Sequence, residues 1–85
     1  MATDRIVRVV GAAKETYGAV RPADSAWRAI WERLEAYRRG EGWPERTGQF
    51  ADVLRLDDGR RIKLGFWCRT PNLLELHLIK VVRPG

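Results

Sequence analysis

Residues 60–69 read RRIKLGFWCR, and every second position in this stretch is apolar. The apolar phase consists of Ile62, Leu64, Phe66 and Cys68. A period of two is the repeat of a β-strand, in which successive side chains point to opposite faces of a sheet. The pattern therefore predicts a strand with one buried face. The opposite face, called the outer face below, receives the cations of this stretch and Trp67.

The turn Asp57-Asp58-Gly59 joins this strand to an earlier one, expected over residues 50–56. A two-residue turn would pair Arg55 with Ile62 and send apolar side chains into water. A three-residue turn with Gly59 in a left-handed conformation pairs Leu54 with Ile62 instead, and Phe50 with Phe66. We therefore expect the three-residue turn. On the outer face it sets Arg55 opposite Arg61 and Val53 opposite Lys63. Like charges directly across strands are destabilising, so an anionic partner is expected there.

The turn Thr70-Pro71-Asn72 leads into a last strand, expected over residues 73–82. The same reasoning pairs the core-facing residues Cys68 with Leu74, Phe66 with Leu76 and Leu64 with Leu78. On the outer face it pairs Trp67 with Glu75 and Gly65 with His77, and it sets Lys63 beside Ile79. Gly65 has no side chain, so a shallow dent is expected beside His77.

The first half of the chain predicts one further strand and one clear helix. Residues 5–10 are short and β-branched, which is typical of a strand. A helix begins at Asp24 or Ser25, which can cap it, and ends at Gly40. Its apolar stripe consists of Trp27, Ile30, Trp31, Leu34 and Tyr37. That stripe is expected to cover the sheet.

Residues 11–23 are ambiguous, because AAKETY favours a helix whereas Gly18 and Pro22 interrupt one. In the loop at residues 40–48, Trp43 is expected to fold back over an edge of the core. Residues 1–85 are expected to form a single α+β domain. One main helix packs on one face of a mostly antiparallel sheet of about four strands, in the order β-α-β-β-β.

The chain has 85 residues and a net charge of +5, which suits RNA, an acidic protein or another anionic macromolecule. No apolar run reaches the length of a membrane span, and no secretory signal opens the chain, so we expect a cytoplasmic protein without membrane contact. One cysteine excludes an internal disulfide. With one histidine and no ligand cluster, neither a metal nor a cofactor is expected.

The outer face combines cations, which neutralise phosphates, with an aromatic ring on which bases stack. This mixture is typical of sheets that hold single-stranded RNA. The residues expected to bind nucleic acid are Arg55, Arg61, Lys63, Trp67 and Arg69. His77 and Glu75 share the same face, and a histidine beside a carboxylate is a recognisable acid–base pair that could cleave RNA through attack by its 2′-hydroxyl. The simpler interpretation is that an antiparallel sheet has a wet, polar side.

The stretch VLRLDDGRRIKLGFWCRTPNLLELHLIK, residues 53–80, resembles the RelE/ParE superfamily of bacterial toxins, including its HigB-like members. The order strand, helix and three-stranded antiparallel meander in a small basic chain is similar as well. The resemblance implies an endoribonuclease that cuts messenger RNA on the ribosome and is neutralised by an antitoxin. Carried over by position, it nominates Arg55, Arg61, Lys63, Glu75, His77 and Lys80.

Two classes of function remain open from the sequence. The first is RNA binding through the outer face, with or without toxin-like cleavage. The second is a non-enzymatic protein–protein interaction module, such as a small phage- or plasmid-encoded inhibitor, in which the same face docks an acidic protein or a second copy of the chain in a homodimer. Aromatic and arginine side chains are enriched in such interfaces.

Overall fold

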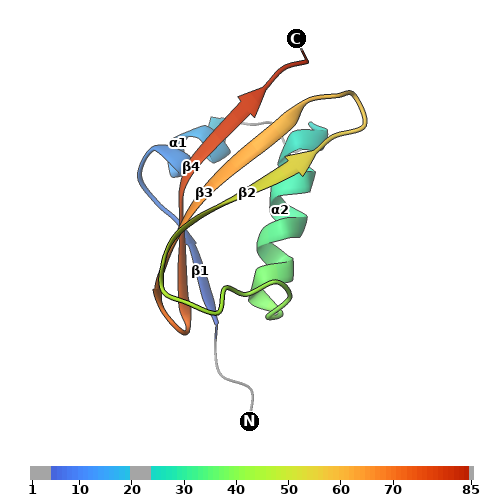
Figure 1. The fold of residues 1–85 in the computed structure, drawn as a ribbon. Coiled ribbons are helices and arrows are strands. Elements are labelled where there is room, and N and C mark those ends of the chain that lie inside the picture. Colours follow the sequence, from blue (N-terminus) through green and yellow to red (C-terminus); the bar gives the residue numbers. More distant parts are fainter. Residues whose placement is uncertain (1–4, 20–23, 85) are drawn as a thin grey trace.

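The described residues form one mixed sheet with two helices beside it (Figure 1). The computed structural model describes residues 5–19 and 24–84. The strands are β1 (Ile6–Val9), β2 (Gly48–Arg55), β3 (Arg61–Thr70) and β4 (Leu73–Val82). The helices are α1 (Gly11–Ala19) and α2 (Ser25–Arg38). The predicted α+β class is thereby confirmed.

The sheet has the strand order β1-β4-β3-β2. Strands β2, β3 and β4 form the predicted antiparallel meander. β1 instead runs parallel to β4, with Val7 beside Leu74 and Val9 beside Leu76. The sheet is therefore mixed. The local pattern of residues 5–10 predicted a strand but contained no signal for its partner.

The segment left open in the sequence contains a second helix, so the element order is β-α-α-β-β-β. α1 includes Gly18, and residues 20–23 of that segment lie outside the described part of the chain. Ala13 is fully buried, and the ring of Tyr17 stacks on Trp27 of α2 at a centroid distance of 5.8 Å. The expectation of one main helix was incomplete, because burial and stacking stabilise a helix that local propensity leaves marginal.

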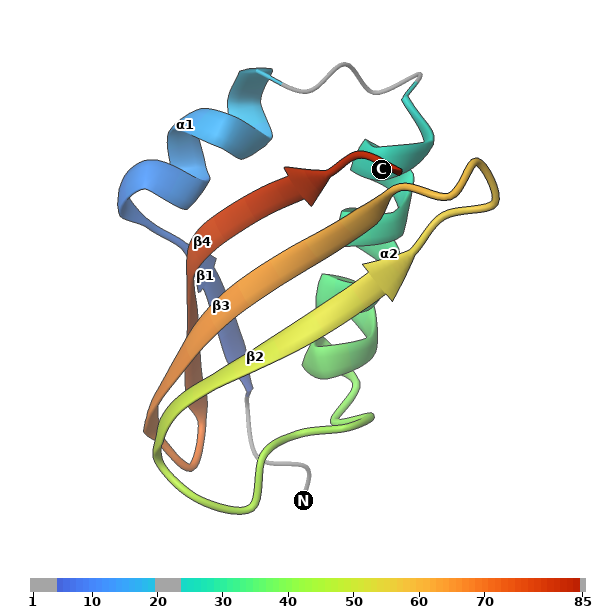
Figure 2. The same ribbon diagram turned by 45° about the horizontal axis from the view of Figure 1, so that its top comes forward.

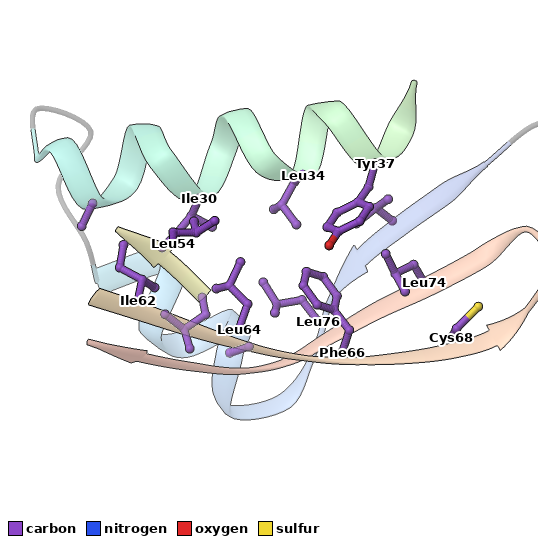
Figure 3. Packing of buried hydrophobic residues seen from close by; sticks show 14 residues of the cluster. Ile30, Leu34, Tyr37, Leu54, Ile62, Leu64, Phe66, Cys68, Leu74 and Leu76 are labelled. Atoms are coloured by element: carbon purple, nitrogen blue, oxygen red, sulfur yellow. The ribbon is translucent and has the colours of Figure 1, made fainter. Parts of the chain in front are cut away.

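The core lies between α2 and the sheet (Figure 3). Ile30, Leu34 and Tyr37 project from α2 onto a layer of side chains from the meander. Two members of the predicted stripe are less buried than expected: Trp27 is intermediate and Trp31 is 44% exposed, with their rings stacked at 6.4 Å. The predicted stripe is therefore wider than the contact with the sheet.

The first hairpin has the predicted register. Leu54 pairs with Ile62 and Phe50 with Phe66, and Gly59 has a φ of +89° in the turn. The core face of β2 is not wholly apolar, however. Asp52 lies between Phe50 and Leu54 on that face and accepts a hydrogen bond of 2.8 Å from the Tyr37 hydroxyl. A polar residue is tolerated there because β2 is an edge strand, where water reaches the carboxylate.

α2 is fixed at both ends as its sequence predicts. Asp24 caps the N-terminus by accepting a bond of 2.9 Å from the backbone N–H of Ala26. Gly40 follows the C-cap with a φ of +85°, and its N–H donates to the carbonyl of Tyr37. In the loop that follows, Trp43 is partly buried and packs against the core, as expected.

Candidate nucleic-acid interface

The outer face of the sheet carries no helix among the described residues. α2 covers the opposite face and α1 lies along the β4 side of the sheet (Figures 1 and 2). Alternation in β3 is regular: Ile62, Leu64 and Phe66 are buried, while Arg61 and Lys63 are exposed. The structure therefore leaves the basic side of the meander open to solvent.

Pairing of β3 with β4 follows the prediction only as far as Leu76. Trp67 lies opposite Glu75 and Phe66 opposite Leu76, but Gly65 then pairs with Leu78 rather than with His77. His77 is the extra residue of a β-bulge. A bulge sets two successive residues against one on the neighbouring strand and turns a side chain in a new direction. The predicted partners of Gly65 and Leu64 were therefore wrong by one residue.

The bulge changes which residues of β4 face the core. Ile79 pairs with Leu64 and is 6% exposed, whereas the residue predicted there, Leu78, is 44% exposed. Lys80 moves to the outer face opposite Lys63, where Ile79 had been expected. Without the bulge, the phase of Leu74 and Leu76 would have continued to Lys80 and turned its ammonium group toward α2. Burying that charge would be costly, which gives a physical reason for the bulge.

Four cations thus form two directly opposed pairs on the outer face: Arg55 with Arg61, and Lys63 with Lys80. Among the described residues, none of the four makes an ion pair within 4.0 Å. All four are exposed. Their positive charge is not neutralised by the described part of the protein, so this end of the face attracts anions.

A hollow lies next to the lysine pair. It has a volume of about 360 Å³ and is lined by residues of the three meander strands: Gln49, Phe50, Ala51, Gly65, Phe66, Trp67, His77 and Leu78. Ala51 and Gly65 are register partners, so two small residues stand side by side there. A Cβ added at Gly65 would lie 3.0 Å from the Cβ of Leu78. The dent expected beside His77 is present, and Leu78 forms part of its wall.

Arg69, Glu75 and His77 form one hydrogen-bonded chain beside this hollow. The Nε of Arg69 donates to Oε1 of Glu75 at 2.7 Å, and Nε2 of His77 lies 3.0 Å from the same oxygen. These two contacts hold the pKa of Glu75 below its usual range, and the contact with Arg69 contributes more than the contact with His77. Because an ionised carboxylate only accepts hydrogen bonds, Nε2 carries the hydrogen toward Glu75. Whenever the imidazole is neutral, the other ring nitrogen, Nδ1, is its acceptor.

The ring of Trp67 has two close neighbours. The guanidinium carbon of Arg69 lies 3.8 Å from the ring centroid, and the imidazole of His77 lies 6.1 Å away at a tilt of 50°. A cation at this distance is attracted to the aromatic face. Arg69 therefore covers one face of the indole and also fixes Glu75. Its charge is engaged by other described residues, whereas the charges of the four opposed cations are not.

The sequence analysis missed a cation of this face. Arg8 of β1 pairs with Glu75 and is exposed, whereas its neighbour Val7 is buried. Alternation puts Arg8 on the outer face beside the Arg69–Glu75–His77 chain. Its position depends on the parallel pairing of β1 with β4, which no local pattern indicated.

Residues 5–19 and 24–84 hold no group of three or more histidine, cysteine or acidic side chains suited to a metal. Neither described helix is long and apolar enough to cross a bilayer. Cys68 is buried, and burial raises the pKa of its thiol.

In comparisons with known proteins, the chain matches no family model, no curated protein and no solved structure.

Proposed function

We propose that this protein binds single-stranded RNA through the outer face of its sheet. The observation that carries the proposal is the hollow at Gly65, which has an aromatic wall and adjoins cations that make no ion pair with the described residues. Trp67 and His77 border it on one side, and Lys63 and Lys80 occupy the next outward-facing row. Aromatic rings stack on bases and cations neutralise phosphates, so the arrangement fits a strand whose bases are unpaired.

The binding test reverses one charge of the open face. Arg61→Glu should abolish binding of a short single-stranded RNA, because it inserts a repelling carboxylate among the cations. Arg28→Glu, at an exposed position of α2, changes the net charge equally and should preserve binding. Fluorescence anisotropy at several salt concentrations measures both. If both variants lost RNA binding equally, net charge alone would explain the effect. Unchanged binding in Arg61→Glu would refute the proposal.

The same proposal extends to cleavage of the bound strand, in line with the toxin resemblance. Nδ1 of His77 would accept the proton of a ribose 2′-hydroxyl as its oxygen bonds to the adjacent phosphorus. The bond from phosphorus to the 5′-oxygen breaks, leaving a 2′,3′-cyclic phosphate, and the departing oxygen takes a proton from solvent. Glu75 acts as a positioning residue because it fixes the imidazole. Lys63 and Lys80 lie where they could stabilise the added negative charge.

His77→Ala should remove cleavage and leave RNA affinity within about twofold, since general acid–base groups contribute about 10²–10⁴ in rate and little to binding. Glu75→Gln keeps the shape but removes the charge that orients the ring. It should shift the pH dependence of cleavage as well as lower the rate, whereas damage to the fold would lower the rate alone. Gel analysis of a labelled RNA measures both. A strand with a 2′-deoxy nucleotide at the cleavage site should resist cleavage. If His77→Ala cleaved RNA as fast as the wild-type protein, this chemistry would be excluded.

A second candidate is a non-enzymatic docking site for an acidic protein or a second copy of the chain. It is favoured by Val53 and Leu78, which are 49% and 44% exposed among the cations of this face. Static light scattering over a concentration series would detect self-association. A dimer that binds no RNA at moderate salt would favour this candidate over the first.

A further inference from the structure

We infer that the hollow at Gly65 holds one unstacked nucleobase, so that the RNA is recognised by a base as well as by its phosphates. This rests on the proposed function and specifies its ligand. The inference depends on three features of the hollow: its small floor, its aromatic wall and the position of the lysine pair relative to both.

The floor leaves space that larger residues would fill. Ala51 and Gly65 lie side by side in the register of β2 and β3, and Leu78 is the partner of Gly65 on the other side. Because these two residues are small, the surface of the outer face is recessed over the adjacent strands β2 and β3, which lie roughly 5 Å apart. Together with the surrounding walls this gives about 360 Å³, enough for a planar ring but not for a helical duplex.

The wall beside this floor is fixed in place before any ligand arrives. Arg69 covers one side of the Trp67 ring, and the tilted ring of His77 lies near it. His77 is itself held by Glu75. A base that stacks on the remaining aromatic surface therefore does not have to order these side chains, which favours affinity. Gln49 lines the same hollow and supplies an amide that can donate to and accept from a base edge.

The lysine pair lies one row further along the strands. Lys63 and Gly65 are two residues apart on β3, or roughly 7 Å along the strand. Arg61 follows at about twice that distance. These intervals suit a strand whose base enters the hollow while its neighbouring phosphates lie over Lys63 and Lys80 and then over Arg55 and Arg61. A duplex presents its phosphates without a free base, so the site should prefer single strands.

The test compares a six-nucleotide RNA with the same strand carrying one abasic ribose at a central position. The wild-type protein should bind the intact strand about 5- to 150-fold more tightly, the range expected when one stacked base is removed. Ala51→Leu fills the hollow from the edge strand without changing charge and should bring this ratio close to one. The matched control Val53→Leu, on the same strand and face, should keep the wild-type ratio.

Trp67→Leu provides a second variant, because it removes the wall instead of filling the floor. It should also abolish the preference for the intact strand, and circular dichroism would verify the fold of each variant. A wild-type ratio near one, or an unchanged ratio in Ala51→Leu, would overturn the inference. If Arg61→Glu still abolished binding in that case, the proposed RNA binding would stand and only the base site would fall. Absence of any RNA binding would overturn both.

Discussion

Glu75 is an acidic side chain on a cationic surface, and its environment explains why it stays ionised. Arg69 and His77 both contact its Oε1, and the pKa of the carboxyl lies below its ordinary value of 4.5. A proton donor has to be protonated at working pH, which this carboxyl is not. At the scale of single residues, Glu75 is therefore suited to orient His77 and not to donate a proton itself.

Lys63 and Lys80 show the opposite situation, because the described structure does not neutralise them. Lys63→Glu would convert a repelling pair into an attractive one. We expect it to raise the free energy of unfolding by about 0.2–1 kcal/mol, an effect that decreases with added salt. Urea unfolding at two salt concentrations measures it.

The same substitution should weaken RNA binding strongly, so stability and affinity are expected to change in opposite directions. Lys63→Gln, which removes the charge without reversing it, should reduce the salt dependence of binding by about 0.7 in the slope of log affinity against log salt, the value for one phosphate contact on a single strand. If Lys63→Glu stabilised the protein and left RNA binding unchanged, the lysine pair would have no part in the interface.

At the scale of elements, the hairpin of β2 and β3 determines which face of the sheet is apolar, and it also contacts α2. Arg60, just after the turn, donates to Asp58 at 2.7 Å and reaches Asp24 at the N-cap of α2 at 3.2 Å. The turn itself needs a left-handed residue, which Gly59 supplies with a φ of +89°. The hairpin turn and the helix start are thus linked by one guanidinium group.

Gly59→Ala should destabilise the protein by about 1–2 kcal/mol, because an L-residue with a Cβ is strained in the left-handed region of backbone conformation. The added Cβ has ordinary contacts with Pro84, the nearest at 3.5 Å, so the cost is expected to come from the backbone. Gly59→Asn should cost less, since asparagine tolerates this conformation. Thermal unfolding of the two variants compares them, and equal losses would contradict a backbone origin.

The carboxyls around Arg60 make stability depend on pH. The pKa of Asp24 is lowered, first by the backbone N–H of Ala26 and then by Arg60, and that of Asp58 is lowered chiefly by the backbone N–H of Arg60. A carboxyl whose pKa is lower in the folded than in the unfolded state stabilises the fold above its unfolded pKa. That contribution is lost as pH falls through the folded value.

The melting temperature should therefore be level near neutral pH and fall below about pH 4. Asp24→Asn should have a lower melting temperature at neutral pH and a weaker fall in acid, because one of the protonating groups is gone. A parallel fall in wild type and variant would contradict a role for Asp24 in the acid response.

At the scale of the whole molecule, a small core holds one thin layer of helix against one sheet. Leu64 and Leu76 are fully buried under α2, and the outer face adds nothing to that core. A domain of this length has only about 4–13 kcal/mol of stability. The cations of the outer face, which have no ion-pair partner in the described part of the chain, are therefore carried by a fold with little stability in reserve.

Leu76→Ala should lower the free energy of unfolding by about 2–5 kcal/mol, which is a large part of that total. Circular dichroism during urea unfolding measures the loss. Leu78→Ala, two residues along β4, provides the contrast: Leu78 is 44% exposed, so its loss should be much smaller. Similar losses at both positions would contradict the bulge, which exchanges Leu78 for Ile79 in the core.

The sequence by itself determined the polarity of the meander, because period-two alternation and the turn at Gly59 permit only one register that buries Ile62, Leu64 and Phe66. It thereby predicted the opposed Arg55 and Arg61 and the dent at Gly65. The phase of β4 beyond Leu76 was predicted wrongly, because the alternation of Leu74 and Leu76 was extended to Leu78 across the bulge at His77.

Only the tertiary structure decided the partner of β1, the existence of α1 and the outward position of Arg8. These depend on contacts between segments distant in the sequence: Val7 beside Leu74, and Tyr17 stacked on Trp27. Local patterns report which side of a segment is apolar, whereas pairing between distant segments depends on the total burial and hydrogen bonding of the assembled chain. The charge pattern of the outer face was therefore largely readable in the sequence, and its boundary along β1 was not.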